Sequence, residues 1–270
     1  MMKKLLALTL SLLLAACCVP ALASGGGNRL EKILADKKLV VATSPDYAPY
    51  EFIDLAKTGP EAIVGADIAL ARHLAEQLGV ALEIQSLDFD AVLAAVSRGS
   101  VDVALSGLVP KEERKEVMDF TAVYYNDGNQ VVVINKKDAD KYTTLASFAG
   151  TKVAAQNGTL QYELVSTQLP GATPELITAI PTAILMLQSD KVAGVALASV
   201  VADQYVANYP DLVIAEERFA YESLGVAGAV PKGETELVAK LDELLAEVTA
   251  SGLYQTWIDE ANELASSQKQ

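Results

Sequence analysis

The sequence predicts an α/β fold divided into two lobes. Short apolar runs of strand type alternate with amphipathic helical patterns through residues 39–105, and the same alternation begins again at residue 151. This alternation is typical of sheets built from βαβ units with right-handed crossovers. About 245 residues follow the amino-terminal segment, a length that suits one large domain or two modest ones.

Residues 1–24 have the pattern of an export signal, with two lysines followed by a short apolar run. Two processing sites compete within it. Leu14–Cys17 has the form of a lipobox, which would place a lipid on Cys17 and anchor the protein at the cell surface. Cleavage after Ala23 would instead release a periplasmic protein. The glycines at positions 25–27 would serve as a flexible tether and favour the lipoprotein.

The composition excludes several classes of function. Both cysteines, Cys17 and Cys18, lie in the export segment, and His73 is the single histidine. The folded part therefore has no disulfide, no soft-metal site and no histidine-based catalytic triad, so we expect neither metal nor cofactor. A net charge of −14 makes the chain a poor partner for nucleic acid.

The first part of the chain reads as alternating helices and strands. An aromatic loop with two prolines, residues 44–52, follows the first strand, and loops at such strand ends are where α/β proteins bind ligands. The expected elements are a helix over 28–38, strands over 39–43, 81–84 and 101–105, and helices that end at residues 78 and 98.

The second part repeats this rhythm and then returns. We expect strands over 131–134, 151–155, 175–178 and 192–197, and helices over 160–168, 181–187 and 199–208. A strand over 225–230 leads back to the first lobe, and two helices end the chain. We therefore expect residues 28–127 and 226–264 to form the first lobe, and residues 128–225 to form the second.

The stretch Ser106–Phe120 organises the expected site. A strand runs into a small-residue turn at Ser106 and Gly107, and a short charged helical segment containing Arg114 follows. Free N–H groups at such a turn and an arginine fork together suit a carboxylate. The same charged run is also typical of a solvated helix face.

Seven short motifs in a fixed order carry a resemblance to a known family. They are Val40–Thr43, Tyr47–Phe52, Val64–Ile68, Ser106–Gly107, Glu113–Lys115, Asp119–Phe120 and Gln156–Thr159. The set resembles the polar amino-acid-binding proteins of bacterial ABC importers, extracellular solute-binding proteins of the glutamine-, histidine- or lysine/arginine-binding type. The similarity runs from about residue 38 to residue 262.

The resemblance implies a type II periplasmic-binding-protein fold, in which each lobe is a sheet flanked by helices and two hinge strands join the lobes. It implies a monomer that is not an enzyme. The two lobes would close on a free amino acid or a related small carboxylate and deliver it to an ABC permease in the membrane.

The resemblance also assigns roles to individual residues. Arg114 matches the arginine that binds the ligand's α-carboxylate. Ser106 and the backbone at Gly107 and Val109 match first-lobe polar contacts, and Thr159 matches a second-lobe donor to the carboxylate.

Three further positions match the walls of the ligand pocket. Tyr47 and Phe89 match residues that flank the ligand's side chain, and Gln161 matches a second-lobe pocket position.

Three positions depart from the family pattern. Ala198 stands where the family places an aspartate for the ligand's ammonium group, and an unpaired ammonium is costly to bury. We expect Glu222 to replace that aspartate, although a plain surface glutamate fits the sequence equally well. Ser44 stands where relatives that bind cationic side chains often carry an aspartate, which weakens the case for lysine or arginine. Val109 stands where a hydroxyl residue is common.

The main alternative is an enzyme on the same scaffold. A lyase similar to cyclohexadienyl dehydratase would need a general acid in the cleft. The sequence offers Glu222, Glu163 or Asp46 for that role and nothing that distinguishes them from surface carboxylates.

Overall fold

The computed structural model describes residues 28–126 and 128–268. The expected export segment, residues 1–24 with Cys17 and the site after Ala23, lies outside these residues. Within the described ranges, no helix is both long and apolar enough to cross a bilayer.

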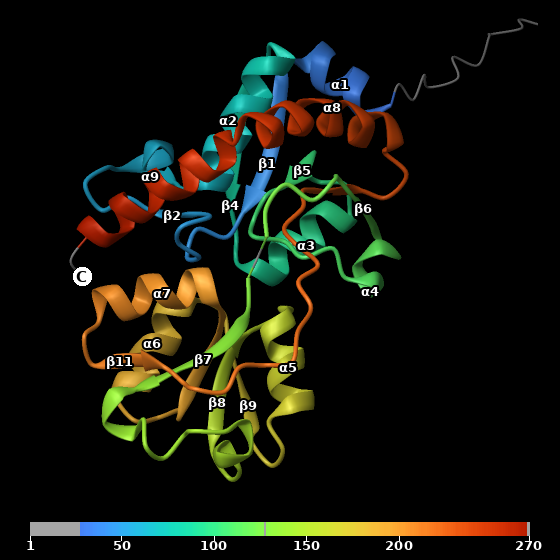
Figure 1. Ribbon diagram of the computed structural model, residues 1–270. Coiled ribbons are helices and arrows are strands. Elements are labelled where there is room, and N and C mark those ends of the chain that lie inside the picture. The colour runs from blue at the N-terminus through green and yellow to red at the C-terminus, as the bar shows by residue number, and fades with distance from the viewer. Residues whose placement is uncertain (1–27, 127, 269–270) are drawn as a thin grey trace, which may run out of the picture.

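Two five-stranded sheets form the two lobes, one above the other in Figure 1. The first sheet has the order β4-β1-β5-β12-β6, and the second has the order β11-β7-β10-β8-β9. Strand β12 (Ala229–Pro231) belongs to the first sheet although it comes last in the sequence, as the predicted return of the chain requires.

The first lobe surrounds a mixed sheet. Strands β4, β1 and β5 are parallel, and β12 runs antiparallel to β5 and β6. A small hairpin of β2 and β3 lies beside the sheet. The strands are β1 (Lys38–Thr43), β2 (Phe52–Ile53), β3 (Ile63–Val64), β4 (Ala81–Ser86), β5 (Val103–Ala104) and β6 (Met118–Phe120). The helices are α1 (Arg29–Asp36), α2 (Ala66–Leu78), α3 (Phe89–Ser97), α4 (Glu112–Lys115), α8 (Thr235–Ser251) and α9 (Leu253–Ser267).

The second lobe is also mixed. Strands β10, β8 and β9 are parallel, whereas β7 runs antiparallel to β10 and β11. The strands are β7 (Gln130–Asn135), β8 (Lys152–Gln156), β9 (Thr173–Ile177), β10 (Gly194–Ala198) and β11 (Leu212–Ile214), and the helices are α5 (Leu160–Gln168), α6 (Ile180–Gln188) and α7 (Ser199–Asn208). Three short 3-10 turns, at 59–62, 136–138 and 145–148, complete the elements of the described chain.

Helix α2 illustrates why the predicted pattern becomes a helix here. Leu70 and Leu74 are at most 1% exposed, because the i, i+4 spacing places both side chains on the face that packs against the first sheet. Gly79 ends the helix in the left-handed conformation with a φ of +67°, which glycine adopts without steric cost.

Two chain segments that run side by side in opposite directions join the two lobes. Tyr125 pairs with Val226 in an antiparallel bridge, and the Val226 N–H donates to the Tyr125 carbonyl at 2.8 Å. Figure 1 shows both segments between the sheets. We propose the lobe boundaries at this crossing, near residues 127 and 225; residue 127 itself lies outside the described residues.

Candidate ligand-binding site

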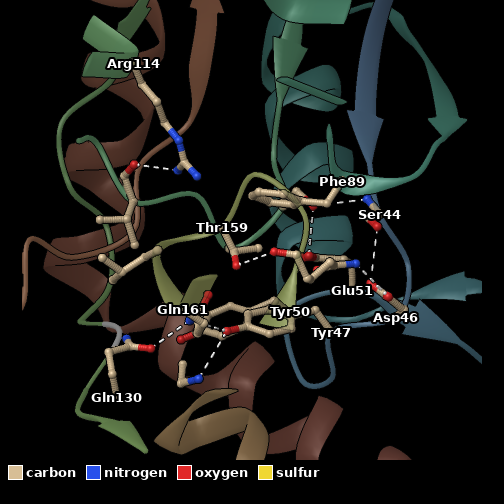
Figure 2. Close-up of a pocket in the computed structure, with 16 residues that line it drawn as sticks. Ser44, Asp46, Tyr47, Tyr50, Glu51, Phe89, Arg114, Gln130, Thr159 and Gln161 are labelled. Carbon is tan, nitrogen blue, oxygen red and sulfur yellow. Dashed lines mark hydrogen bonds between the residues drawn. The ribbon is translucent and has the colours of Figure 1, made fainter. Parts of the chain in front are cut away.

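A cavity lies between the two lobes and draws side chains from both (Figure 2). It comprises about 490 Å³ of space not filled by atoms, including its open mouth. Ten of the eleven predicted ligand-binding residues line it: Ser44, Tyr47, Phe89, Ser106, Gly107, Val109, Arg114, Thr159, Gln161 and Ala198. The structure therefore brings these ten residues, from both lobes, to one cavity.

Arg114 is a buried cation in this cavity, with 7% of its surface exposed. One guanidinium nitrogen donates to the Val109 carbonyl and the other to the Gly158 carbonyl of the second lobe, both at 2.9 Å. Its guanidinium carbon lies 5.6 Å from the centre of the Phe89 ring. Burial lowers the pKa of Arg114 to about 10, so the group stays charged at neutral pH. A guanidinium has five N–H donors, which leaves three for a ligand.

The turn before Arg114 differs from the expectation. The Gly107 N–H donates to Asp67 Oδ2 at 2.8 Å, so the prediction that it is free for a ligand is wrong. Ser106 Oγ accepts the Ser44 N–H and donates to Glu51 Oε1, both at 3.0 Å. Helix α4 is a single turn of four residues. The turn therefore supports the floor of the cavity with its own bonds, because buried polar groups need partners.

The start of helix α5 supplies the second lobe's side of the cavity. Thr159 caps the helix: its Oγ1 accepts the Tyr162 N–H at 3.3 Å and donates to the Gln156 carbonyl at 2.7 Å. Leu160 and Gln161, the first two helical residues, line the cavity as well. The amino-terminal end of a helix carries partial positive charge, so this end favours an anion.

Polar but uncharged groups fill the place of the missing aspartate. The Ala198 N–H donates to the Tyr47 hydroxyl at 3.3 Å. Gln161 Nε2 donates to the same hydroxyl at 3.3 Å and to Gln130 Oε1 at 2.7 Å. Figure 2 shows Tyr47, Gln161 and Gln130 together at one end of the cavity. No carboxylate takes part in these hydrogen bonds.

Asp46 and Glu51 are the carboxyl groups that line the cavity. Asp46 Oδ2 accepts Gln156 Nε2 and the Ile180 N–H, both at 2.9 Å, and burial raises the pKa of Asp46. Glu51 is 1% exposed. Burial and the nearby charge of Asp67 raise its pKa well above the usual range.

Comparison with known proteins places the chain in a family. Residues 39–260 match the bacterial extracellular solute-binding proteins, family 3. This chain belongs to that family. The predicted family and the type II periplasmic-binding-protein fold are confirmed, and so is the predicted function class, a substrate-binding component of an amino-acid ABC importer.

This solute-binding protein is similar to three known proteins over most of its length. The arginine-binding extracellular protein ArtP of Bacillus subtilis (strain 168) is 34% identical over 248 residues, which cover 90% of this chain and 93% of ArtP. A substrate-binding protein of an amino-acid ABC transporter from Streptococcus pneumoniae Canada MDR_19A, solved bound to L-arginine, is 36% identical with a TM-score of 0.83 and covers 88% of this chain and 98% of its own.

The third is the ancestral amino-acid-binding protein AncCDT-1, described as a precursor of cyclohexadienyl dehydratase. Its crystal structure is 27% identical with a TM-score of 0.77 and covers 86% of this chain and 98% of its own. ArtP is named as an arginine-binding protein and the streptococcal protein as a substrate-binding protein.

Glu222 does not take the place of the missing aspartate. It is exposed and absent from the cavity lining, so its expected role is wrong. The segment before it is anchored to the second lobe, where Phe219 is buried and its N–H donates to the Gln130 carbonyl. This anchoring directs Glu222 to solvent.

Sequence reasoning assigned no ligand contact to several residues that line the cavity. They are Asp46, Tyr50, Glu51, Gln130, Gln156 and Leu160. One signal was available for Asp46, which lies between Pro45 and Pro49 in the rigid loop at the end of β1. Such loops present side chains at the carboxyl edge of a sheet.

Proposed function

We propose that this solute-binding protein captures a cationic amino acid, L-arginine before others, between its two lobes. One observation carries the proposal. The cavity has a buried guanidinium, Arg114, on one side of Phe89 and two carboxyl groups, Asp46 and Glu51, on the other (Figure 2). L-arginine carries one anionic and two cationic groups, so its charges match those of the lining.

The carboxylate of the ligand is expected at the Arg114 end. The planar guanidinium fork suits a carboxylate, and the start of helix α5 adds partial positive charge from the second lobe. Because Arg114 also bonds the Gly158 carbonyl of the second lobe, it acts where the lobes meet. A carboxylate bound there would hold both lobes at once.

The cationic groups of the ligand are expected near Asp46 and Glu51. Both carboxyl groups are withdrawn from water, so a cation in the cavity offers them a partner that solvent does not. Ser44 had weakened the case for lysine or arginine, since relatives often carry an aspartate there. Asp46, two residues later and on the same loop, supports that case again.

The two similar proteins named for arginine add support. ArtP is called arginine-binding, and the streptococcal structure contains L-arginine. Both exceed 30% identity over most of their length. Their cargo is carried over to this chain as part of the proposal.

Capture would proceed by closure of the two lobes and delivery to an ABC permease by a monomer. The lobes are already in contact through bonds such as Asn157 Nδ2 to Asp90 Oδ2 at 2.8 Å and Gln204 Nε2 to Asn262 Oδ1 at 2.7 Å. A ligand that makes more contacts in this arrangement than in an open one would shift the population toward it.

The family is extracellular, and we propose attachment to the membrane through a lipid on Cys17. Mass spectrometry of the mature protein decides this. Lipid on an amino-terminal Cys17 is the expected result. An unmodified mature chain that begins after Ala23 would instead indicate a free periplasmic protein.

Binding calorimetry with matched ligands tests the cargo. We would use protein that begins at residue 25 and compare L-arginine with L-citrulline, which replaces the guanidinium by a neutral group of similar shape. L-lysine and L-glutamine complete the panel. We expect arginine to bind at least about tenfold more tightly than citrulline, because a buried carboxyl without its cation costs over 1 kcal/mol. Equal binding of citrulline or glutamine would refute the cationic cargo.

A lyase is the second candidate, and one observation favours it. Glu51 is a cavity carboxyl with a raised pKa, the state that a general acid needs, and AncCDT-1 is described as a precursor of a dehydratase. Incubation with prephenate and with arogenate tests this function by the appearance of the aromatic product. We expect no product above the rate without protein.

A further inference from the structure

Two buried carboxyl groups lie next to each other beneath the cavity. Glu51 lines the cavity, and Asp67, in helix α2, lies behind it with no exposed surface. The Asp67 N–H donates to the carbonyl of Tyr50, the residue before Glu51, at 2.9 Å, and the adjacent residues Ser106 and Gly107 donate to Glu51 and Asp67 respectively. Two neighbouring carboxylates that are both desolvated repel each other strongly, so one of them keeps a proton.

Donors distinguish the two groups. Asp67 accepts three hydrogen bonds: the Gly107 N–H at 2.8 Å, the Tyr124 hydroxyl at 2.8 Å and the Tyr254 hydroxyl at 2.6 Å. Glu51 accepts one, from Ser106 Oγ at 3.0 Å. Its Oε2 has no hydrogen-bond donor in the described part of the chain. Three donors stabilise a charge on Asp67, whereas none of the described residues donates a hydrogen bond to Glu51 Oε2.

The proton therefore belongs on Glu51. A protonated Oε2 can donate to Asp67, which satisfies both groups, because a carboxylic acid is a donor and a carboxylate only an acceptor. The raised pKa of Glu51 is consistent with a proton on this group, since burial contributes most to the increase and the charge of Asp67 contributes next. Burial also raises the pKa of Asp67, but its hydrogen bonds act in the opposite direction.

We propose that Glu51 is a proton-coupled specificity residue: it is a neutral acid in the unliganded protein and releases its proton when a cationic group of the ligand enters the cavity. The inference rests on the proposed function. The O–H bond of Glu51 breaks heterolytically, the proton passes to solvent, and the new carboxylate pairs with the ligand cation. A neutral ligand gains nothing from this exchange, so Glu51 selects for charge.

The groups around Glu51 are consistent with this exchange. The titratable and charged groups near it come from its own loop, from α2, from the segment before β7 and from α9, and the cation of the cavity lining, Arg114, lies beyond Phe89. They are Asp46 and Tyr50, Asp67, and Tyr124 and Tyr254, whose hydroxyls donate to Asp67. The Ser106 hydroxyl, from the turn after β5, donates to Glu51 itself. No lysine, arginine or histidine of the described chain forms an ion pair with Glu51, so the ligand would supply its first cation.

The experiment is calorimetric titration with L-arginine in two buffers that differ in ionisation enthalpy, at a series of pH values from 5 to 8. The dependence of the apparent enthalpy on the buffer gives the number of protons released. We expect about one proton per arginine at the acidic end, falling as free Glu51 loses its proton at higher pH. Infrared difference spectra should show the C=O band of a protonated carboxyl disappear when arginine is added.

Two variants make the test specific. Glu51→Gln keeps the shape of the side chain and cannot ionise, so arginine should bind at least about tenfold more weakly and release no proton. Glu76→Gln changes an exposed carboxyl that does not line the cavity and should retain both binding and release.

The outcomes separate the two claims. Arginine binding with no proton release, or with the same release in Glu51→Gln, would overturn this inference and leave the proposed function intact. If arginine does not bind the unmodified protein at any pH, the proposed function falls and this inference falls with it.

Discussion

The carboxylate of Asp46 caps a helix that belongs to the other lobe. Its Oδ2 accepts the N–H of Ile180, the first residue of α6, at 2.9 Å. The residue that precedes α6, Ala179, has no side chain that could cap the helix. First-lobe Asp46 thus satisfies a second-lobe helix only while the two lobes are together, which links the capping energy to closure.

We predict that Asp46→Ala shifts the lobes toward an open arrangement. Loss of an N-cap acceptor costs about 0.5–2 kcal/mol, so the arginine dissociation constant should rise about 2- to 30-fold from closure alone. Distance measurements between labels on cysteines introduced at the exposed positions Glu76 and Lys191 would report opening directly. Cysteine is absent from residues 28–268, so such labels are specific.

Asp46→Asn is the matched control for this prediction. The amide keeps one oxygen that can accept the Ile180 N–H, so the labels should stay closer together than in the alanine variant. If both variants leave the distance distribution unchanged without ligand, the capping bond contributes nothing to closure.

Arg114→Ala is expected to weaken arginine binding by about 10- to 150-fold. A hydrogen bond to a charged group contributes about 1.5–3 kcal/mol, and the variant removes the fork opposite the ligand carboxylate. Arg114→Lys should recover only part of the loss, because an ammonium is a point charge and cannot bind a carboxylate in the bidentate manner. Calorimetry supplies the affinities. Undiminished binding by the alanine variant would place the ligand carboxylate elsewhere.

The sequence predicted most of the fold because its periodic patterns are strong. Helix α2 and strand β1 have clear 3.6-residue and apolar patterns, and both appear within two residues of the expected limits where those were given. Strands β6 and β11 were missed, since each has only three residues and β6 also contains the charged Asp119. These segments are strands because they pair with β12 and β7, and the local sequence does not indicate those pairings.

The sequence predicted a site residue where a motif contains it. It did not predict hydrogen-bond partners that the fold brings together from distant parts of the chain. Arg114 lies in the cavity as the motif implied. The Gly107 N–H, in contrast, is taken by Asp67, forty positions earlier in the chain. Glu222 and Glu51 are both glutamates beside aromatic residues, and only tertiary packing buries one and exposes the other. No local signal distinguishes them.

Glu51 should give the folded protein a stability that falls as pH rises. Its folded pKa lies well above the ordinary glutamate value of 4.5, so above pH 4.5 the unfolded chain loses this proton while the folded protein keeps it. The folded state then binds more protons than the unfolded state, and the free energy of unfolding decreases with pH until the folded pKa is reached, by up to about 1.4 kcal/mol per pH unit for one group.

Urea unfolding of the unliganded protein at pH 5, 6 and 7 would measure this contribution. The decrease should be smaller in Glu51→Gln, and Glu76→Gln should follow the unmodified protein because its exposed side chain does not change burial on folding. Parallel curves for all three proteins would contradict a protonated Glu51.

Gly158 is the position where a single methyl group should impede closure. Its φ is +77°, and a Cβ built there would lie 3.3 Å from Leu93 Cδ1 and 3.8 Å from Asp90 Cβ, both in the first lobe. Gly158→Ala therefore combines backbone strain with a contact that exists only between the lobes. Gly79→Ala has the same strain, with a φ of +67°, and open space around the new methyl.

We expect both variants to lose similar stability to urea, about 1–2 kcal/mol from the positive φ. Gly158→Ala alone should also bind arginine more weakly and widen the distance between labels at Glu76 and Lys191. Equal affinities in the two variants would show that the first lobe can accommodate the methyl group in the closed arrangement.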